Sequence, residues 1–437
     1  MNRKEAEDYI FASYMKASKF QDYNKKDSEK RKPHLTKNIL ENLSKSVNIG
    51  VTGSKGKGSL ANMISQILQT QFKVGLFTSP HIYTINERFK INGVEISDED
   101  FVRIVGEVKK YFDPIISQLP KDECLSPIGI EAAIALTYFN ENNTDINIME
   151  FGKGAKYDDV NNVIHKYSLI NSIFFEHKRE LGDNIEEIAK DKCMIIKRGQ
   201  ICAYSGKQEE SLLKIIRERA REMGVPLKVY GEDFYEENVS YTLEGMKFDA
   251  VLPDLRINDL LVPLIGDYQV RNAMLALIVC KDIIKTMDIA GVRENLKKLK
   301  YPARFEIISR DPLIILDACI NRKSAEEIKK SLKALKINKL TSIIGIPDDK
   351  DYFGVAKEMK EISTDIILTK SSNPHYIFTS VQRENLSKKK IDVKESSNIK
   401  EAIELAKKNC LPIIILGTTS LISESKLYFN NIKDKLF

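Results

Sequence analysis

The sequence lacks the features of a disulfide-bonded, metal-cluster or membrane protein. Its six cysteines are widely spaced along 437 residues, and none forms a CxxC pair or has histidines nearby at metal-ligand spacing. The N-terminal segment has no apolar core of signal-peptide length, and no apolar run approaches the roughly 18 residues that a membrane helix requires. We therefore expect a cytoplasmic protein with reduced thiols and no membrane partner.

An excess of charge of one sign is also missing. Lysine and arginine total 68 against 62 aspartates and glutamates, and the net charge of +6 is spread along the whole chain. This balance does not indicate a nucleic-acid partner, and it leaves anionic small molecules as partners. The length and a hydrophobic content of 42% predict two or three packed domains.

The most informative segment is 47–59, VNIGVTGSKGKGS, where an apolar run leads into a glycine-rich loop. The loop glycines permit a tight turn that brings backbone N–H groups close to phosphate oxygens, and the next helix would present its positive N-terminus. Lys57 would supply charge for the outer phosphates, and the Ser59 hydroxyl a magnesium ligand. A lysine-rich surface turn is the alternative, but the strand, loop and helix context favours a phosphate-binding loop. Its glycines are Gly53, Gly56 and Gly58.

The N-terminal part of the chain alternates short apolar runs with helical periodicity, which predicts an α/β domain with a parallel sheet covered on both faces. Ligands of such sheets bind outside the carboxyl ends of the strands, where Ser79, Glu150 and His177 fall. We therefore expect these three side chains beside the phosphate loop. The predicted strands after the loop are 73–79, 146–152 and 169–175.

The C-terminal part predicts a second α/β domain. Segment 232–262 reads as a small β excursion before a helix that starts near Gln269. The α/β pattern restarts at about residue 301, so we expect domains at 1–300 and 301–437, with a mobile linker at 299–304. The strands predicted for the second parallel sheet are LIILDA, LTSIIGI, DIILTK, KIDVKE and PIIILG.

Chemistry alone leaves two of these candidates open. Glu150 offers a hard oxygen ligand for magnesium, although a strand-end carboxylate can also simply face solvent. A lone histidine such as His177 is more often structural, and imidazole is an uncommon magnesium ligand. Residue types by themselves therefore do not choose His177.

The chain resembles the folylpolyglutamate synthase and dihydrofolate synthase family of the Mur ligase superfamily, which are ATP-dependent amide ligases. GSKGKGS and the following KVGLFTSPHIYTINERFKINGVEISDEDF carry the resemblance. It implies a P-loop NTPase-like N-terminal domain, a smaller Rossmann-like C-terminal domain and, as is common in the family, a monomer. Further matches are EFGKGAKYDDVNN (150–162), EHKRELGDNIEEIAKDKCMIIK (176–197), GDYQVRNA (266–273), YPARFE (301–306), LDACIN (316–321) and DKDY (349–352).

The resemblance implies ATP and two magnesium ions as cofactors. The phosphate loop would hold ATP, and Lys192 matches a lysine that becomes carbamylated and binds the second magnesium through the new anion. Asn272 and Arg304 match nucleotide contacts, and Asp317 an aspartate on the ATP side of the C-terminal domain. By the same resemblance, Asp158 and Asn161 lie in a loop that would bind the substrate. The implied metal ligands are Ser59, Ser79, Glu150, His177 and Lys192, and the implied catalytic residues are Lys57, His177, Lys192 and Arg304.

The implied reaction transfers the γ-phosphoryl group of ATP to a carboxylate, and an amine then attacks the acyl phosphate to form an amide. Folate and glutamate are the favoured substrates. The chain departs from the family mainly around the acceptor sites, so a ligase for another carboxylate and amine is an alternative, and a non-catalytic nucleotide-binding protein is a second one. The departures are Lys153, Ala155, Asp159, Val160, Glu176, Tyr268 and Ile320.

Overall fold

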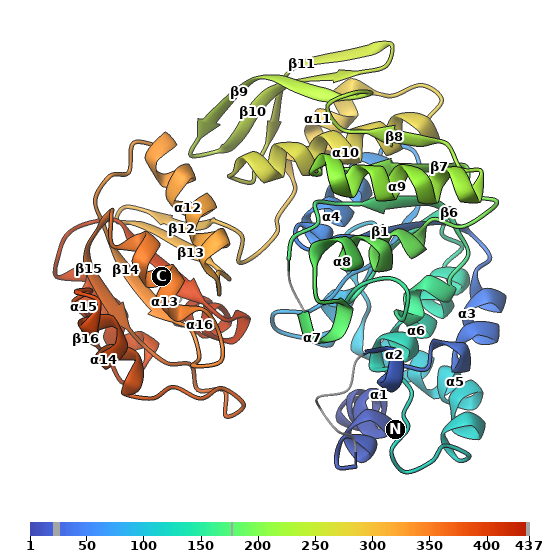
Figure 1. The fold of residues 1–437 in the computed structure, drawn as a ribbon, viewed down its shortest axis with the longest axis horizontal. Coiled ribbons are helices and arrows are strands. Elements are labelled where there is room, and N and C mark those ends of the chain that lie inside the picture. The colour runs from blue at the N-terminus through green and yellow to red at the C-terminus, as the bar shows by residue number, and fades with distance from the viewer. Residues whose placement is uncertain (21–26, 176–177, 434–437) are drawn as a thin grey trace. The chain divides into compact units, whose positions relative to one another are not determined.

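The computed structural model describes residues 1–20, 27–175 and 178–433 (Figure 1). The chain forms two compact units. The first comprises Met1–Asn238, Phe248–Leu261 and Tyr268–Leu299, and the second comprises Val239–Lys247, Val262–Asp267 and Lys300–Phe437.

The first unit is built on an eight-stranded sheet with the order β4-β3-β2-β5-β1-β6-β7-β8. Its centre is parallel as predicted, because β1 pairs in parallel with both β5 and β6. One edge of the sheet is antiparallel, where β3 runs antiparallel to both β2 and β4. The strands are β1 (Val47–Thr52), β2 (Val74–Phe77), β3 (Phe89–Ile91), β4 (Val94–Glu95), β5 (Ile146–Glu150), β6 (His165–Ile170), β7 (Cys202–Ser205) and β8 (Leu227–Val229).

The strand predicted at 169–175 is β6, which begins earlier and ends at Ile170. From Ser172 onward, the backbone N–H groups donate to side chains instead of to a neighbouring strand. Ser172 N–H donates to the Asn171 amide oxygen at 2.8 Å, and Phe174 N–H donates to the Ser54 hydroxyl at 2.9 Å. Residues 171–175 therefore form a loop beside the phosphate loop.

Helices of the first unit enclose the sheet and form its apolar core with it (Figure 1). Their starts follow local sequence, as in α5, where Ser97 caps the first turn and three acidic residues complement the helix dipole. No described helix is both long and apolar enough to span a membrane. The helices are α1 (Arg3–Ser18), α2 (Asp27–Lys30), α3 (Lys37–Leu43), α4 (Lys57–Leu68), α5 (Asp98–Ile116), α6 (Pro127–Glu141), α7 (Lys178–Leu181), α8 (Ile185–Lys192), α9 (Glu210–Met223), α10 (Asp267–Ile283) and α11 (Ile289–Lys297), with 3-10 turns η1 (Pro33–Leu35), η2 (Ile85–Arg88), η3 (Asp159–Asn162) and η4 (Cys193–Ile195).

The predicted β excursion is a three-stranded sheet with the order β11-β10-β9. Its strands are β9 (Tyr235–Thr242), β10 (Gly245–Leu252) and β11 (Leu255–Val262), and α10 follows at Asp267, two residues before the expected start. Buried and less buried positions alternate through much of β10, which is the period-2 pattern of a strand with one covered face.

The second unit contains a six-stranded sheet with the order β12-β13-β17-β14-β15-β16. It is parallel except for β12, which pairs antiparallel with β13. The strand predicted from KIDVKE shrinks to β16, two exposed residues at the sheet edge. The strands are β12 (Glu306–Arg310), β13 (Leu313–Asp317), β14 (Leu340–Gly345), β15 (Ser363–Leu368), β16 (Lys394–Glu395) and β17 (Ile413–Gly417), and the helices are α12 (Arg322–Ala334), α13 (Tyr352–Met359), α14 (Val381–Lys388), α15 (Ile399–Lys407) and α16 (Thr419–Lys433).

Candidate active site

The phosphate loop lies between β1 and α4, at the carboxyl end of the central strand. Gly56 is the N-cap of α4 and has no side chain to accept hydrogen bonds from the first turn. The N–H groups of that turn are therefore free to donate to a ligand in the loop. Such partly positive N–H groups at a helix start favour a bound anion.

Two loop positions require glycine for two reasons. Gly53 and Gly56 have φ values of 144° and 79°, which side chains rarely adopt. A Cβ at Gly53 would lie 2.8 Å from the Asn171 Cβ, and one at Gly56 would lie 2.9 Å from the amide groups of Asn171 and Asn272. The loop is therefore shaped both by its own backbone and by the two asparagines packed against it.

Two predicted lysines meet at this loop. Lys57 Nζ donates to the Gly53 carbonyl oxygen at 3.2 Å, and Lys192 Nζ at the end of α8 donates to the same oxygen at 3.0 Å. Lys192 is only 1% exposed, although lysines are rarely buried without a partner. The structure thus places Lys192 at the phosphate loop, whereas on sequence spacing alone it is an ordinary helix-surface lysine.

The oxygen groups predicted to bind metal lie at the same edge of the sheet. Glu150 ends β5 opposite Val51 of β1, and its Oε2 accepts the backbone N–H of Ser79 at 3.1 Å. Glu150 and Ser59 are 3% and 2% exposed. Ser79 and Glu150 therefore come together as predicted, while His177 lies outside the described residues.

This donor set fits magnesium. Mg²⁺ is usually held by one or two carboxylates together with waters and substrate phosphates. Over the described residues, which exclude His177, no three His, Cys, Asp or Glu side chains gather as a metal cage. One buried carboxylate, Glu150, with Ser79 beside it is a set suited to a site that the substrate phosphates share.

A buried row of amides, absent from the sequence predictions except for Asn272, joins the loop to α10. Asn171 Nδ2 donates to Asn272 Oδ1 at 2.7 Å, and Asn272 Nδ2 donates to Gln269 Oε1 at 3.1 Å. Gln269 lies within the matched segment GDYQVRNA, but Asn171 had no signal because it lies inside the predicted strand 169–175. The contact predicted between Asn272 and the nucleotide base stays a prediction.

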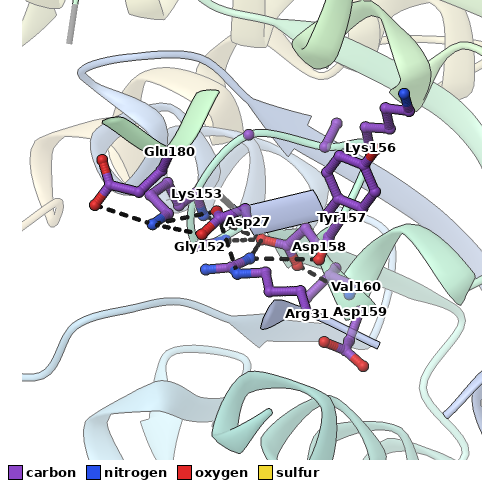
Figure 2. Close-up of polar contacts among 12 residues, drawn as sticks. Asp27, Arg31, Gly152, Lys153, Lys156, Tyr157, Asp158, Asp159, Val160 and Glu180 are labelled. Carbon is purple, nitrogen blue, oxygen red and sulfur yellow. Dashed lines mark hydrogen bonds and ion pairs between the residues drawn. The ribbon is translucent and has the colours of Figure 1, made fainter. Parts of the chain in front are cut away.

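The loop after β5 is organised around Asp158 (Figure 2). This aspartate is fully buried, and its carboxylate accepts the backbone N–H groups of Gly152, Lys153 and Val160 at 2.9–3.0 Å. Burial raises the pKa of Asp158, and Arg31 and these N–H groups oppose that rise. In the structure Asp158 shapes the substrate loop from inside, so its predicted contact with substrate remains untested.

Asn161, the second residue predicted to bind substrate, ends the same loop. Its Nδ2 donates to the Met194 carbonyl oxygen at 3.2 Å, and its side chain is largely buried. Its buried Oδ1 has no hydrogen-bond partner within the described chain. That oxygen is the part of Asn161 that is still able to accept a hydrogen bond.

Lys153, one of the departures from the family, is part of an ion-pair cluster (Figure 2). Its Nζ lies 3.2 Å from Asp27 Oδ2 and 3.4 Å from Glu180 Oε1, so it links α2 to α7. Arg31 Nε also lies 3.4 Å from Asp27 Oδ2 and Nη1 lies 3.9 Å from Asp158 Oδ2. Sequence analysis missed Asp27 and Arg31, because only the fold brings α2 to this loop.

Within the second unit, Asp317 ends β13 and accepts the backbone N–H of Phe305 at 2.8 Å. Ala303 and Phe305 have φ values of 61° and 47°, so both neighbours of the half-buried Arg304 are in the left-handed region. A strained turn of this kind needs support from its surroundings, such as the bond from Phe305 N–H to Asp317. The predicted contacts of Arg304 and Asp317 with ATP stay predictions.

Comparison with known proteins agrees with this site. Residues 51–280 match the family model "Mur ligase middle domain", a segment that begins in β1 and ends in α10. It contains the phosphate loop, Glu150, Lys192 and the row of amides. Fold and site thus define a Mur ligase, an ATP-dependent enzyme that forms amide bonds.

Comparison with individual relatives shows which family of Mur ligases the chain resembles. The chain is 32% identical to folylpolyglutamate synthase of Lacticaseibacillus casei over 71% of its length and 73% of the relative. It is 31% identical to dihydrofolate synthase/folylpolyglutamate synthase of Bacillus subtilis over 80% of both chains. The apo form of the L. casei enzyme superposes with a TM-score of 0.82, at 26% identity, over 98% of this chain and 100% of that one. A complex of folylpolyglutamate synthase with AMPPCP and folate gives 0.81 at 28% identity, over 98% and 100%. The chain therefore belongs to the folylpolyglutamate synthase and dihydrofolate synthase family.

The glycine requirement at position 56 predicts that Gly56→Ala weakens ADP binding at least about ten-fold, because the new Cβ collides with two asparagine amides. Isothermal calorimetry with ADP measures the effect. Gly199→Ala is the matched control, since Gly199 has a similar φ of 87° but no atom within 4 Å of an added Cβ. Equal ADP affinity in both variants would show that the collision is unimportant.

We predict that Asp159 makes the folding stability of the protein depend on pH. Its carboxylate is buried, its Oδ1 accepts the Thr36 hydroxyl at 2.7 Å, and burial raises its pKa to about 6. Because this pKa lies above the unfolded value of about 3.9, the folded protein loses stability as pH rises from about 4 to 6. Asp159→Asn removes that loss.

We expect denaturant unfolding to show a gain of about 1 to 3 kcal/mol for Asp159→Asn at pH 8 and a much smaller gain at pH 4.5. The same gain at both pH values would contradict an ionised, buried Asp159.

Proposed function

We propose that this protein is a folylpolyglutamate synthase, which uses ATP to join glutamate to a reduced folate, with dihydrofolate synthesis as a second activity. The observation that carries the proposal is the meeting of Lys57, Lys192, Ser59 and Glu150 at the carboxyl edge of the sheet, around an anion-binding loop. The relatives named above support the substrates, since one complex contains AMPPCP and folate and the B. subtilis relative carries both activities in its name.

Each group has a role in phosphoryl transfer. The N–H groups at the start of α4 and Lys57 would neutralise the charge that moves from the γ-phosphate to the substrate carboxylate. Ser59, Ser79 and Glu150 would hold magnesium, which bridges the phosphates and stabilises that charge when bound. Lys57 would turn from the Gly53 carbonyl to the phosphates, since both lie within reach of its flexible side chain.

Lys192 fits the role of a carbamylated ligand. The free amine would attack CO₂ and lose a proton, leaving a carbamate with a single negative charge shared by two oxygens in place of a cation. That change would replace a charge that repels Mg²⁺ by a ligand that attracts it. The near-complete burial of Lys192 beside the phosphate loop supports this role, because an unmodified ammonium there faces a second ammonium, Lys57, across a single carbonyl.

The folate assignment predicts that the purified protein releases ADP with ATP, magnesium, tetrahydrofolate and glutamate, and that the folate gains one glutamyl mass. Lys57→Ala should lower ADP release at least about 100-fold, because a cation at the transferred phosphate is lost. Lys214→Ala, on the exposed surface of α9, is the control. A chain that binds ADP but ligates nothing would be a nucleotide-binding partner protein.

One observation favours a second candidate, a ligase for a non-folate carboxylate. Lys153 brings a cation into the substrate loop, and Asp27 and Glu180 neutralise it. Rearrangement of these ion pairs would free the Lys153 ammonium to pair with an acidic group of a different acceptor. A screen of carboxylates and amines separates the two: ADP release with folates alone rejects this candidate, and release only with another pair rejects the folate assignment.

The carbamate predicts a ¹³C NMR resonance when the protein is equilibrated with ¹³C-bicarbonate. The resonance should be present in the parent protein and in Lys57→Ala, which retains the buried amine, and it should disappear in Lys192→Ala. Persistence of the signal in Lys192→Ala would assign the carbamate to another amine, and no signal in any protein would leave Lys192 a simple cation.

A further inference from the structure

Ser59 is the last member of a continuous hydrogen-bonded row of buried side chains in the first unit. From Asn171 the row passes through Asn272 and Gln269, and Gln269 Nε2 donates to Ser59 Oγ at 3.4 Å, the longest link. All four residues are 0–4% exposed. Buried amides without solvent must satisfy one another, so each amide constrains the next.

The direction of the row is set at its far end. The Asn171 Oδ1 accepts the backbone N–H of Ser172 at 2.8 Å, and a backbone N–H can only donate. Asn171 must therefore present its NH₂ group to Asn272, which in turn presents its oxygen to Asn171 and its NH₂ group to Gln269. Gln269 then has only its NH₂ group left for Ser59. A backbone N–H outside the phosphate loop thus makes the Ser59 oxygen an acceptor.

This direction of the hydrogen bonds leaves the Ser59 hydroxyl able to make two further interactions. One lone pair on Oγ is used by Gln269, so one lone pair and the hydroxyl hydrogen remain. No hydrogen bond among the described residues uses that hydrogen, although Ser59 is buried at an anion-binding helix start. A buried donor without an acceptor at such a site is suited to a ligand oxygen.

We propose that Asn171 and Gln269 are positioning residues that direct the Ser59 hydroxyl hydrogen toward a phosphate oxygen of the bound nucleotide, leaving the remaining lone pair for magnesium. The proposal rests on nucleotide binding within the proposed function, and not on the identity of the carboxylate or amine. Reversing the row would turn the Ser59 hydrogen toward Gln269 and withdraw it from the phosphate.

Asn171→Asp reverses the row without changing its shape. The new carboxylate accepts from both Ser172 and Asn272, so Asn272 and then Gln269 must turn over, and Gln269 presents its oxygen to Ser59. The added negative charge alone would also weaken ADP binding. A double-mutant cycle with Ser59→Ala separates the two effects, because a charge acts on the phosphates whether or not Ser59 is present.

We expect calorimetry with MgADP to show that Asn171→Asp weakens binding at least about five-fold in the parent protein and less than about two-fold in the Ser59→Ala protein. Gln269→Glu, which reverses only the last link, should show the same dependence on Ser59. It also keeps the test valid if Asn171→Asp fails to fold. Equal fold-changes with and without Ser59 would overturn the proposal.

Asn147→Asp is the matched control. Asn147 is a fully buried amide at the start of β5, and its partners are Thr144 and Asn48 instead of the phosphate loop. Its conversion should lower the melting temperature but leave the affinity for MgADP within about two-fold. Since the assay uses ADP without folate or glutamate, a negative outcome leaves the folate assignment intact, and a failed folate assay leaves this proposal intact.

Discussion

The phosphate loop depends on the carbonyl group of Gly53, which takes two ammonium groups at once. Lys57 reaches it from the start of α4, and Lys192 reaches it from the end of α8. Both amines are thereby held next to backbone N–H groups that carry partial positive charge. While Lys192 is unmodified, positive charge is thus concentrated at the loop, and it is balanced either by an anion that enters the loop or by the carbamate proposed for Lys192.

Much of the fold follows from sequence pattern, and the exceptions have local causes. The apolar runs at β1 and β5 and the glycine spacing after β1 are enough to place Glu150 beside the loop, because parallel strands align their carboxyl ends. The run at 169–175 ended early because Asn171, Ser54 and Gln208 offer the backbone other partners. Side chains that compete for backbone N–H groups do not recur at regular sequence intervals. The spacing of apolar residues therefore does not reveal them.

The residues of the site also fall into those that sequence pattern predicts and those that it does not. Chemistry and spacing are enough to predict the loop glycines, Lys57, Ser59 and Glu150. Lys192 was predicted only from the likeness to the family, because nothing in the local sequence distinguishes it from other lysines on a charged helix. Arg31, Asp27 and Asn171 were missed because each has a partner that is distant in sequence. The ion pairs to Asp158 and Lys153 depend on residues 27–31 lying against the loop after β5, and the amide row depends on α10 lying against the segment that follows β6. Such contacts depend on three-dimensional packing and leave no local motif.

The bond between Ser172 and Asn171 has a consequence for the chemical ageing of the protein. The Ser172 nitrogen, 2.8 Å from the Asn171 amide oxygen, is also the atom that attacks an asparagine side chain during spontaneous deamidation, a reaction that makes asparagine a thermolabile residue. Loss of ammonia at this one position would turn a neutral amide into a carboxylate inside the molecule. Deamidation of Asn171 would therefore give the same chain as Asn171→Asp.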